Sequence, residues 1–335
     1  MKKHSELLID LILLLSIVAV TVLSGRNLFS GRRGSGDGGN SYEGVAADEV
    51  HFAIQPSAAF IPLYVAKEKG WLDEAMAELG VKVYWHDYDS GPPINESLLS
   101  GEGDVGVLGD VPTVFAIALG QDNVIIATAA QAADSYAVLV PADSDITDIS
   151  QLRGKGFATV IGTTAHNLMD KYLASGNMEM SDVRLVNIAA GDTADILKTH
   201  SADAVAIWEP TVTRLTDAGV ARILGSGSDC GLAGTNTLVA RRAFAEDNPR
   251  LVEIIKEQYK RGAQALSEGL DEDTAAKIAA YMKLDIDQIE ELLPKFDYTV
   301  DITQEDIDSL NDTIAFLYEV KQIPKLFDIS DSVVR

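Results

Sequence analysis

Residues 157–173 constrain the fold most, because a buried strand runs directly into a helix there. The first five residues form an apolar run rich in β-branched side chains, which is typical of a buried strand. Gly162 breaks the run, Thr163 and Thr164 supply N-cap hydroxyls, and residues 165–173 carry a helical pattern. Backbone N–H groups at such a helix start can hold an anion, although many turns of this kind only cap a helix.

A similar turn between a strand and a helix is predicted at three other places: Gln55-Pro56-Ser57, Ser90-Gly91-Pro92-Pro93 and Gly109-Asp110-Val111-Pro112. Strands and helices alternate regularly up to about residue 240, and from residue 243 the pattern is nearly all helical. This predicts an α/β fold with mainly parallel sheets and a helical C-terminal region. The predicted strands are residues 50–55, 81–87, 104–108, 124–129, 136–140, 157–161, 183–187, 204–207, 222–224 and 237–240.

The carboxyl ends of parallel strands lie at one edge of a sheet, where α/β proteins bind ligands. Several helix N-termini converging at that edge would hold an oxyanion without a buried lysine, and short hydroxyl side chains would fix its oxygens. A crossing back near residue 230 suggests two lobes joined by two strands. These features predict an anion site between two lobes.

The N-terminus carries a targeting signal. Lys2 and Lys3 precede an apolar run over residues 7–23, interrupted by Asp10. We expect residues 1–24 to be a cleaved signal peptide or an uncleaved membrane anchor, and either places the body outside the cytoplasm. No cysteine follows this run, so we expect no diacylglyceryl lipoprotein anchor. Residues 25–47 are rich in glycine and predict a flexible linker.

Composition excludes several classes of function. The body, residues 48–335, has 22 basic and 47 acidic residues and a net charge of −25, which disfavours nucleic acid as a partner. The single cysteine, Cys230, excludes a disulfide framework and a cysteine-based metal cluster. The five histidines lack metal-ligand spacing; His86-Asp87 with Asp89 comes nearest. We therefore expect no metal and no cofactor.

Two further motifs have structural explanations. Residues 101–106 match G-x-G-x-x-G, but these glycines follow a helix and lead into a strand, the reverse of a dinucleotide-binding turn. They predict a helix C-cap and a turn instead. Trp208 ends a strand and is interpreted either as core or as a ligand platform. No nucleophile elbow and no P-loop is present.

Four segments together resemble a known family. Residues 60–72 (FIPLYVAKEKGWL), 90–112 (with S-G-P-P and L-L-S-G-E-G-D-V-G-V-L-G-D-V-P), 162–166 (GTTAH) and 204–210 (AVAIWEP) are similar to ABC-transporter substrate-binding proteins for aliphatic sulfonates, taurine and nitrate. The resemblance implies a type II periplasmic-binding fold whose two lobes close on a ligand. It implies a first lobe over residues 48–134 and 230–335, and a second over 135–229.

The resemblance also implies a function and a site. The chain would be a monomeric extracytoplasmic binding protein that captures a small organic anion and passes it to a membrane permease and its ATPase. No reaction would be catalysed. Carried over by position, the ligand loops hold Gln55, Ser57, Ser90, Gly91, Gly109, Asp110, Thr163, Thr164, His166, Trp208 and Glu209.

Two departures keep alternatives open: the long glycine-rich tether and the strongly acidic body. Asp110 and Glu209 would have to point away from a sulfonate or pair with an ammonium group on the ligand. A taurine-like zwitterion would satisfy both, so the alternative ligand is an aminosulfonate, or a cationic or neutral metabolite such as an amine or a pyrimidine. A membrane-tethered sensory domain is a second alternative. A pyrimidine-synthase-like enzyme is a third, which the single cysteine disfavours.

Overall fold

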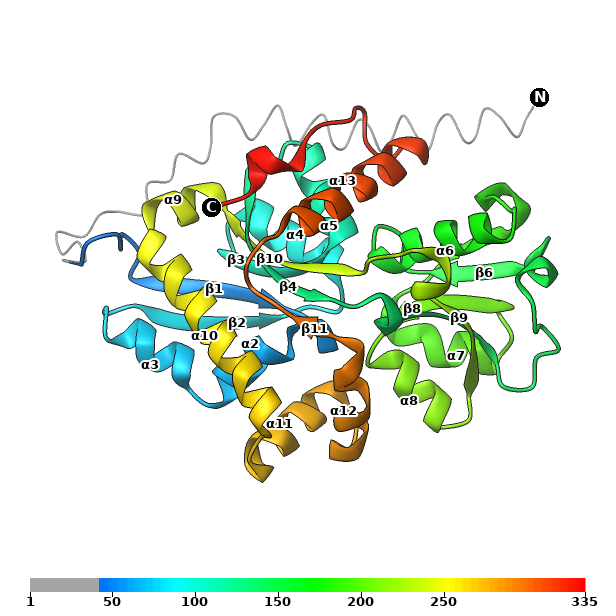
Figure 1. The fold of residues 1–335 in the computed structure, drawn as a ribbon, viewed down its shortest axis with the longest axis horizontal. Coiled ribbons are helices and arrows are strands. Elements are labelled where there is room, and N and C mark those ends of the chain that lie inside the picture. Colours follow the sequence, from blue (N-terminus) through cyan, green and yellow to red (C-terminus); the bar gives the residue numbers. More distant parts are fainter. Residues whose placement is uncertain (1–41, 335) are drawn as a thin grey trace. The chain divides into compact units, whose positions relative to one another are not determined.

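The computed structural model describes residues 42–334, which form two lobes built on two sheets (Figure 1). The first sheet has the order β11 (Asp297–Tyr298), β4 (Asn123–Gln131), β10 (Thr235–Arg241), β3 (Val105–Gly109), β1 (Glu49–Ile54) and β2 (Lys82–Asp87). The second has the order β7 (Arg184–Asn187), β6 (Gly156–Thr159), β8 (Ala204–Trp208), β5 (Tyr136–Pro141) and β9 (Ala221–Ser226). The predicted targeting segment, residues 1–24, and most of the predicted linker lie outside the described residues.

Each sheet combines a parallel half with an antiparallel half. Strands β2-β1-β3 and β7-β6-β8 are parallel, as expected from the βα alternation. The other strands pair antiparallel, because β5 and β10 each arrive from the opposite lobe and enter their sheets from the facing edge. The chain crosses between the lobes at Ala133–Ser135, and again between Leu232, which packs in the core of the second lobe, and the start of β10 at Thr235. The implied lobe boundary at 134/135 lies in the first crossing, and that at 229/230 lies a few residues before the second; both boundaries stay predictions.

Two helices of the first lobe begin at strand-end turns that the sequence predicts. In the first lobe, α2 (Ile61–Glu68) and α4 (Gly91–Ser100) both have proline in their first turn, where its missing N–H costs nothing. Gly101 ends α4 in the left-handed conformation, with a φ of 78°, so the predicted C-cap is confirmed. The remaining α-helices of this lobe are α3 (Trp71–Ala77), α5 (Asp110–Ala118), α9 (Arg242–Asp247), α10 (Pro249–Glu268), α11 (Glu272–Met282), α12 (Ile286–Leu292) and α13 (Gln304–Glu319).

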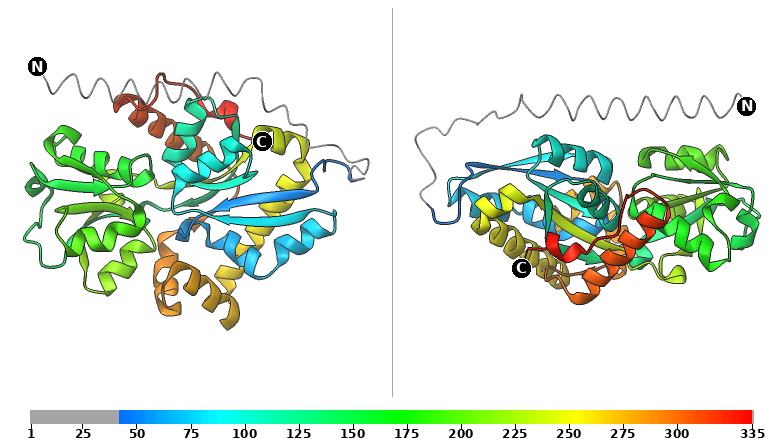
Figure 2. Two further views of the ribbon diagram at one scale, coloured as in Figure 1. Left: turned by 180° about the vertical axis from the view of Figure 1, so that it is seen from behind. Right: turned by 90° about the horizontal axis from the view of Figure 1, so that it is seen from above.

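The second lobe carries α6 (Thr164–Ser175), α7 (Thr193–Lys198) and α8 (Thr211–Asp217) (Figure 2). Each lobe has its own apolar core. Phe52, Phe60 and Tyr259 are fully buried in the first, and Phe157 and Leu168 in the second. Because each core lies within one lobe, we expect the lobes to move as units about the two crossings. Among the described helices none is long and apolar enough to span a membrane.

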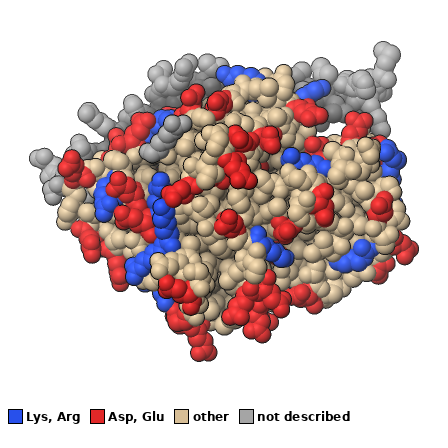
Figure 3. Space-filling view, viewed as in Figure 1, with Lys and Arg blue, Asp and Glu red and all other residues tan. Residues whose placement is uncertain are grey.

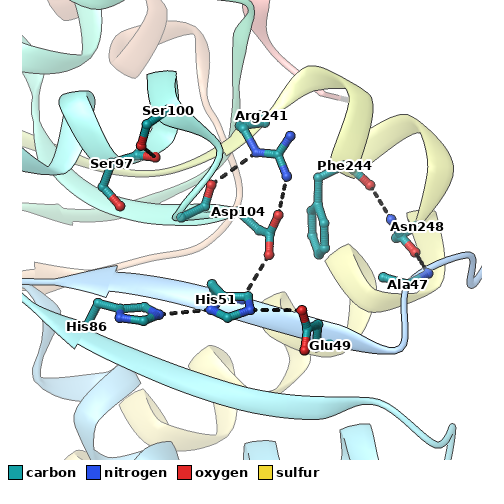
Figure 4. A network of polar contacts seen from close by, with 11 residues as sticks. Ala47, Glu49, His51, His86, Ser97, Ser100, Asp104, Arg241, Phe244 and Asn248 are labelled. Carbon is teal, nitrogen blue, oxygen red and sulfur yellow. Dashed lines mark hydrogen bonds and ion pairs between the residues drawn. The ribbon is translucent and has the colours of Figure 1, made fainter. Parts of the chain in front are cut away.

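A polar network ties the strands of the first sheet together away from the second lobe (Figure 4). The Asp104 carboxylate accepts a hydrogen bond from the backbone N–H of His51 at 2.9 Å and pairs with Arg241. The imidazoles of His51 and His86 are hydrogen-bonded at 2.9 Å, so His86 is engaged with a neighbouring strand. Within residues 42–334, no group of three or more His, Cys, Asp or Glu side chains is placed to hold a metal.

The folded part of the chain begins before residue 48. Val45 is buried, and Asn248 Oδ1 accepts hydrogen bonds from the backbone N–H groups of Ala46 and Ala47 at 2.8 and 2.7 Å. These hydrogen bonds connect the residues just before β1 to the N-cap of α10 (Figure 4). The last residues of the predicted linker therefore pack against the first lobe.

Candidate ligand-binding site

A cavity lies between the lobes at the carboxyl ends of the parallel strands. It encloses about 310 Å³ of empty space, part of it open to solvent. Seven of the predicted site residues line it: Gln55, Ser57, Gly91, Gly109, Thr163, Thr164 and Trp208. Phe60, Pro112, Tyr136 and Asn236 complete the lining. No Lys, Arg, His, Asp or Glu is among these eleven described residues, so an anion here would be held by dipoles.

One helix N-terminus from each lobe points at this cavity. α4 of the first lobe begins at Gly91, and α6 of the second lobe begins at Thr164. No partner in the described part of the chain bonds the backbone N–H groups of Gly91, Thr164 and Ala165. A helix N-terminus carries about half a positive charge, so the two ends together favour a negative group between them.

The N-terminus of α5 differs from these two. Asp110 is its first residue, and the carboxylate accepts a hydrogen bond from the Val111 backbone N–H at 2.8 Å. This negative charge compensates the dipole of α5. An incoming anion therefore gains less from α5 than from α4 or α6.

Two glycines allow the close approach of the elements around the cavity. A Cβ on Gly91 would lie 2.6 Å from Cγ of Pro112, so only glycine lets α4 meet α5. A Cβ on Gly109 would lie 2.3 Å from Thr164 Oγ1, so only glycine lets the second lobe close on α5. Both glycines therefore act through their lack of a side chain rather than through left-handed backbone.

The two threonine hydroxyls are already committed as donors. Thr163 Oγ1 donates to the Val160 carbonyl at 2.7 Å, and Thr164 Oγ1 donates across the lobes to Asp110 Oδ1 at 2.5 Å. This geometry differs from the expectation that hydroxyl side chains fix the anion's oxygens, since each hydroxyl proton has another acceptor. The backbone N–H groups of this turn are the donors that face the cavity without a partner.

Side-chain donors are available elsewhere in the lining. Within residues 42–334, the Ser57 hydroxyl and the indole N–H of Trp208 donate no hydrogen bond. Gln55 Nε2 donates to the Val107 carbonyl at 2.9 Å, which uses one of its two N–H groups. Ser57 belongs to the first lobe and Trp208 to the second, so each lobe contributes one of these donors to the lining.

Both acidic residues of the predicted site point away from the cavity. The Asp110 carboxylate also accepts a hydrogen bond from Thr313 Oγ1 at 2.5 Å. Burial raises the pKa of Asp110, and the hydrogen bonds from Thr164 and Thr313 oppose that rise. Glu209 accepts hydrogen bonds from the backbone N–H and hydroxyl of Thr213, each at 2.9 Å, and from Lys295 at 2.5 Å. Neither carboxylate has a free oxygen aimed at an ammonium group in the cavity.

Two other predicted residues lie close to the cavity without lining it. Ser90 is the N-cap of α4 and is buried. His166 faces the first lobe on another side of α6, where its ring meets Phe316 edge-on and its Nδ1 lies 3.4 Å from Gln322 Nε2. Burial lowers the pKa of His166 and favours the neutral imidazole. These contacts make His166 part of the packing between lobes.

Sequence reasoning missed the pair Tyr136 and Asn236. The Tyr136 hydroxyl donates to Asn236 Oδ1 at 3.0 Å, and burial raises the pKa of Tyr136. Each stands at the start of a strand, β5 or β10, that enters its sheet from the cleft. The start of an antiparallel strand lies at the same edge as the ends of its parallel neighbours, which is how these residues reach the site.

Comparison with known proteins identifies the chain's relatives. The family described as NMT1/THI5 like matches residues 57–271. The chain belongs to this family. A Bacillus subtilis (strain 168) relative named "Putative aliphatic sulfonates-binding protein" is 30% identical over 302 residues, which cover 90% of each chain. The taurine-binding periplasmic protein of Escherichia coli (strain K12) is 28% identical over 52% of this NMT1/THI5-like chain and 54% of its own.

Solved structures of related proteins share the fold. The aliphatic sulphonate binding protein SsuA of Escherichia coli has a TM-score of 0.75 at 26% identity, covering 85% of this chain and 96% of its own. The alkanesulfonate-binding protein SsuA of Xanthomonas axonopodis pv. citri, bound to MOPS, has a TM-score of 0.79 at 24% identity, covering 87% and 100%. The predicted two-lobed periplasmic-binding-protein fold and the resemblance to sulfonate-binding proteins are confirmed.

Proposed function

We propose that this chain is the extracytoplasmic solute-binding component of an ABC importer and captures a small organic anion, most directly a sulfonate. The observation that carries the proposal is the pair of unpartnered helix N-termini, α4 and α6, at one cavity between two lobes. A sulfonate bound by both would bridge the lobes and stabilise their closed arrangement. Relatives named for binding aliphatic sulfonates and taurine support the same ligand class.

The contacts of Asp110 and Glu209 favour an anion over a cationic ligand. Each carboxylate is buried and already accepts hydrogen bonds from threonine, and Glu209 also from lysine. An ammonium group in the cavity would need one of these bonds to break. The eleven lining residues instead offer N–H and O–H donors, which suit sulfonate oxygens.

The composition of the lining favours binding over catalysis. Among its described residues only Tyr136 titrates, and burial raises its pKa further from neutrality. A nucleophile with an adjacent general base is what covalent catalysis needs, and these lining residues do not supply one. We therefore propose that the ligand is released unchanged to a permease and ATPase pair, and that the protein works outside the cytoplasm as a monomer.

Calorimetric titration with ethanesulfonate, taurine and nitrate, and with ethylamine and a pyrimidine as cationic and neutral controls, tests the proposal. We expect sulfonates to bind and to be recovered intact after the protein is unfolded. Ligand at about 100 times its dissociation constant should also raise the free energy of unfolding by about 2.7 kcal/mol. Binding of the amine alone, or chemical conversion of a ligand, would contradict the proposal.

A further inference from the structure

A second cavity adjoins the candidate site and shares Trp208 with it. It encloses about 510 Å³ of empty space, part of it open to solvent. Asp89 follows β2, an edge strand of the first sheet, and Ala190 follows β7, an edge strand of the second sheet. Loops of both lobes therefore form the second cavity. Its lining is Pro56, Asp89, Ala190, Gly191, Trp208, Pro210, Thr211, Arg214, Tyr281, Met282 and Lys283.

Arg214 is the notable group in this cavity. It is half-buried, and the one hydrogen bond of its side chain in the described chain runs from Nη2 to Thr211 Oγ1 at 3.0 Å. No ion pair to Arg214 occurs within residues 42–334. A guanidinium has five N–H donors, so most of its donor capacity is unused by the protein. Its partial burial lowers the pKa of Arg214.

The neighbouring carboxylates do not neutralise Arg214 by contact. Glu209 is the charge that opposes the lowering of its pKa, but the Glu209 oxygens bond Thr213 and Lys295. Asp89 is exposed and forms no ion pair among the described side chains. Tyr281 donates to Asp87 Oδ1 at 2.7 Å and is neutral.

The sign of the charge sets this cavity apart from its surroundings. Arg214 and Lys283 against Asp89 give the lining a net positive charge, in a body whose net charge is −25. Figure 3 shows carboxylates spread over one face of both lobes. By contrast, the cavity between α6 and α13 is lined by Asp110, Glu305, Asp308 and Asp312 against Lys171 alone. The lining of the second cavity is thus net positive by one charge, beside the anion site.

We propose that this cavity is a distal subsite, in which Arg214 and Thr211 bind a second anionic group of a ligand whose sulfonate lies between α4 and α6. The inference rests on the proposed function and narrows its substrate class to organic sulfonates that carry a second acidic group, such as a carboxylate. The linking carbons pass along Trp208, which lines both cavities. A half-buried arginine with unused donors suits bidentate binding of a carboxylate.

The test uses pairs of ligands that differ only at the far end. Propanesulfonate and 3-sulfopropionate have the same length but end in methyl and carboxylate, and longer pairs vary the spacer. Calorimetry should show at least one carboxylate-ended sulfonate binding about tenfold or more tightly than its methyl-ended match, as expected for charge-assisted hydrogen bonds. Arg214→Gln should abolish that gain and leave the affinity for alkanesulfonates unchanged, and Arg214→Lys should retain part of it.

Lys171→Gln is the matched control, because it removes the same charge from the cavity beside α13. It should leave the carboxylate gain intact, and thermal unfolding should show that all variants fold. Equal affinities at every spacer length would overturn the proposal. So would an affinity that rises with chain length alone, since the chain would then lie in the apolar cavity lined by Pro92, Phe115 and Leu119.

The same series separates the failure of this inference from that of the proposed function. If no sulfonate binds but a dicarboxylate binds more tightly than its matched monocarboxylate, with dependence on Arg214, the distal subsite stands and the sulfonate assignment fails. If alkanesulfonates bind and the far carboxylate adds nothing, the sulfonate assignment stands and the distal subsite fails. If no member of either series binds, both fail.

Discussion

The hydrogen bond between Thr164 and Asp110 should act as a latch that holds the two lobes closed. Both side chains are 2% exposed, and Thr164 Oγ1 lies 2.5 Å from Asp110 Oδ1 across the cleft. Thr164→Val keeps the shape of the side chain and removes the donor. A hydrogen bond to a charged group contributes about 1.5–3 kcal/mol, so ligand affinity should fall about 10- to 150-fold if binding requires closure.

Calorimetry on a double-mutant cycle tests the latch. Thr164→Ser keeps the hydroxyl and should bind ethanesulfonate nearly as well as the wild type. Asp110→Asn replaces the charged acceptor, so Thr164→Val should cost less in that background, with a coupling of about 1 kcal/mol or more. Thermal unfolding of the ligand-free variants checks that each folds. If Thr164→Val weakened ligand binding equally with and without Asp110→Asn, Thr164 would act independently of Asp110, and the hydrogen bond between them would not hold the lobes closed.

Three further predictions concern packing, pH and the ion pair between Lys295 and Glu209. Gly91→Ala should lower the free energy of unfolding by about 1–3 kcal/mol and weaken ligand binding, because the added Cβ would clash with Pro112. A denaturant titration measures this loss, with Gly191→Ala as the control because the space around its Cβ is open. Because burial lowers the pKa of His166 in the folded protein, the unfolded chain binds a proton at a higher pH than the folded one, and the free energy of unfolding should fall as the pH drops below about 6.5. His166→Gln should remove this dependence on pH. An unchanged dependence in that variant would show that His166 does not cause it. Lys295→Met leaves the buried Glu209 carboxylate without its cation, so the closed arrangement of the lobes should be less stable and the binding free energy of the ligand should weaken by about 1–3 kcal/mol. Adding Glu209→Gln to this variant should restore most of the lost affinity.

The sequence predicts the fold well because strand and helix signals are local. Apolar, β-branched runs bounded by glycine and proline place the ten predicted strands within a residue or two of the observed ones. The short β11 has no such run, since it contains only Asp297 and Tyr298 and pairs at the sheet edge with β4. Its pairing depends on where the helical C-terminal region returns, which no local pattern encodes.

The site could be predicted at the level of loops but not of side-chain direction. Gln55, Ser57 and Gly91 line the cavity because each follows a parallel strand, which fixes its edge of the sheet. Asp110 and Glu209 belong to equally placed loops, yet their carboxylates turn toward threonine and lysine. Successive residues of a helical first turn point in different directions, so which one faces the cavity depends on how the helix is packed.

Arg214 illustrates the same limit. It lies on α8, one turn beyond the strand end at Trp208, and nothing local distinguishes it from a solvated surface arginine. Only the packing of α11 and the loop after β2 around it makes it the half-buried cation of the second cavity. Contacts between segments this far apart in the chain need the tertiary structure.

A crystal structure of the protein with ethanesulfonate would show directly whether the two helix N-termini hold the anion. We expect the sulfonate in the cavity between the lobes, with its oxygens within hydrogen-bond distance of the backbone N–H groups of Gly91 and Thr164. Asp110 and Glu209 should keep their present partners. A sulfonate bound elsewhere, or held in the cleft by a lysine or arginine side chain instead of these N–H groups, would contradict it.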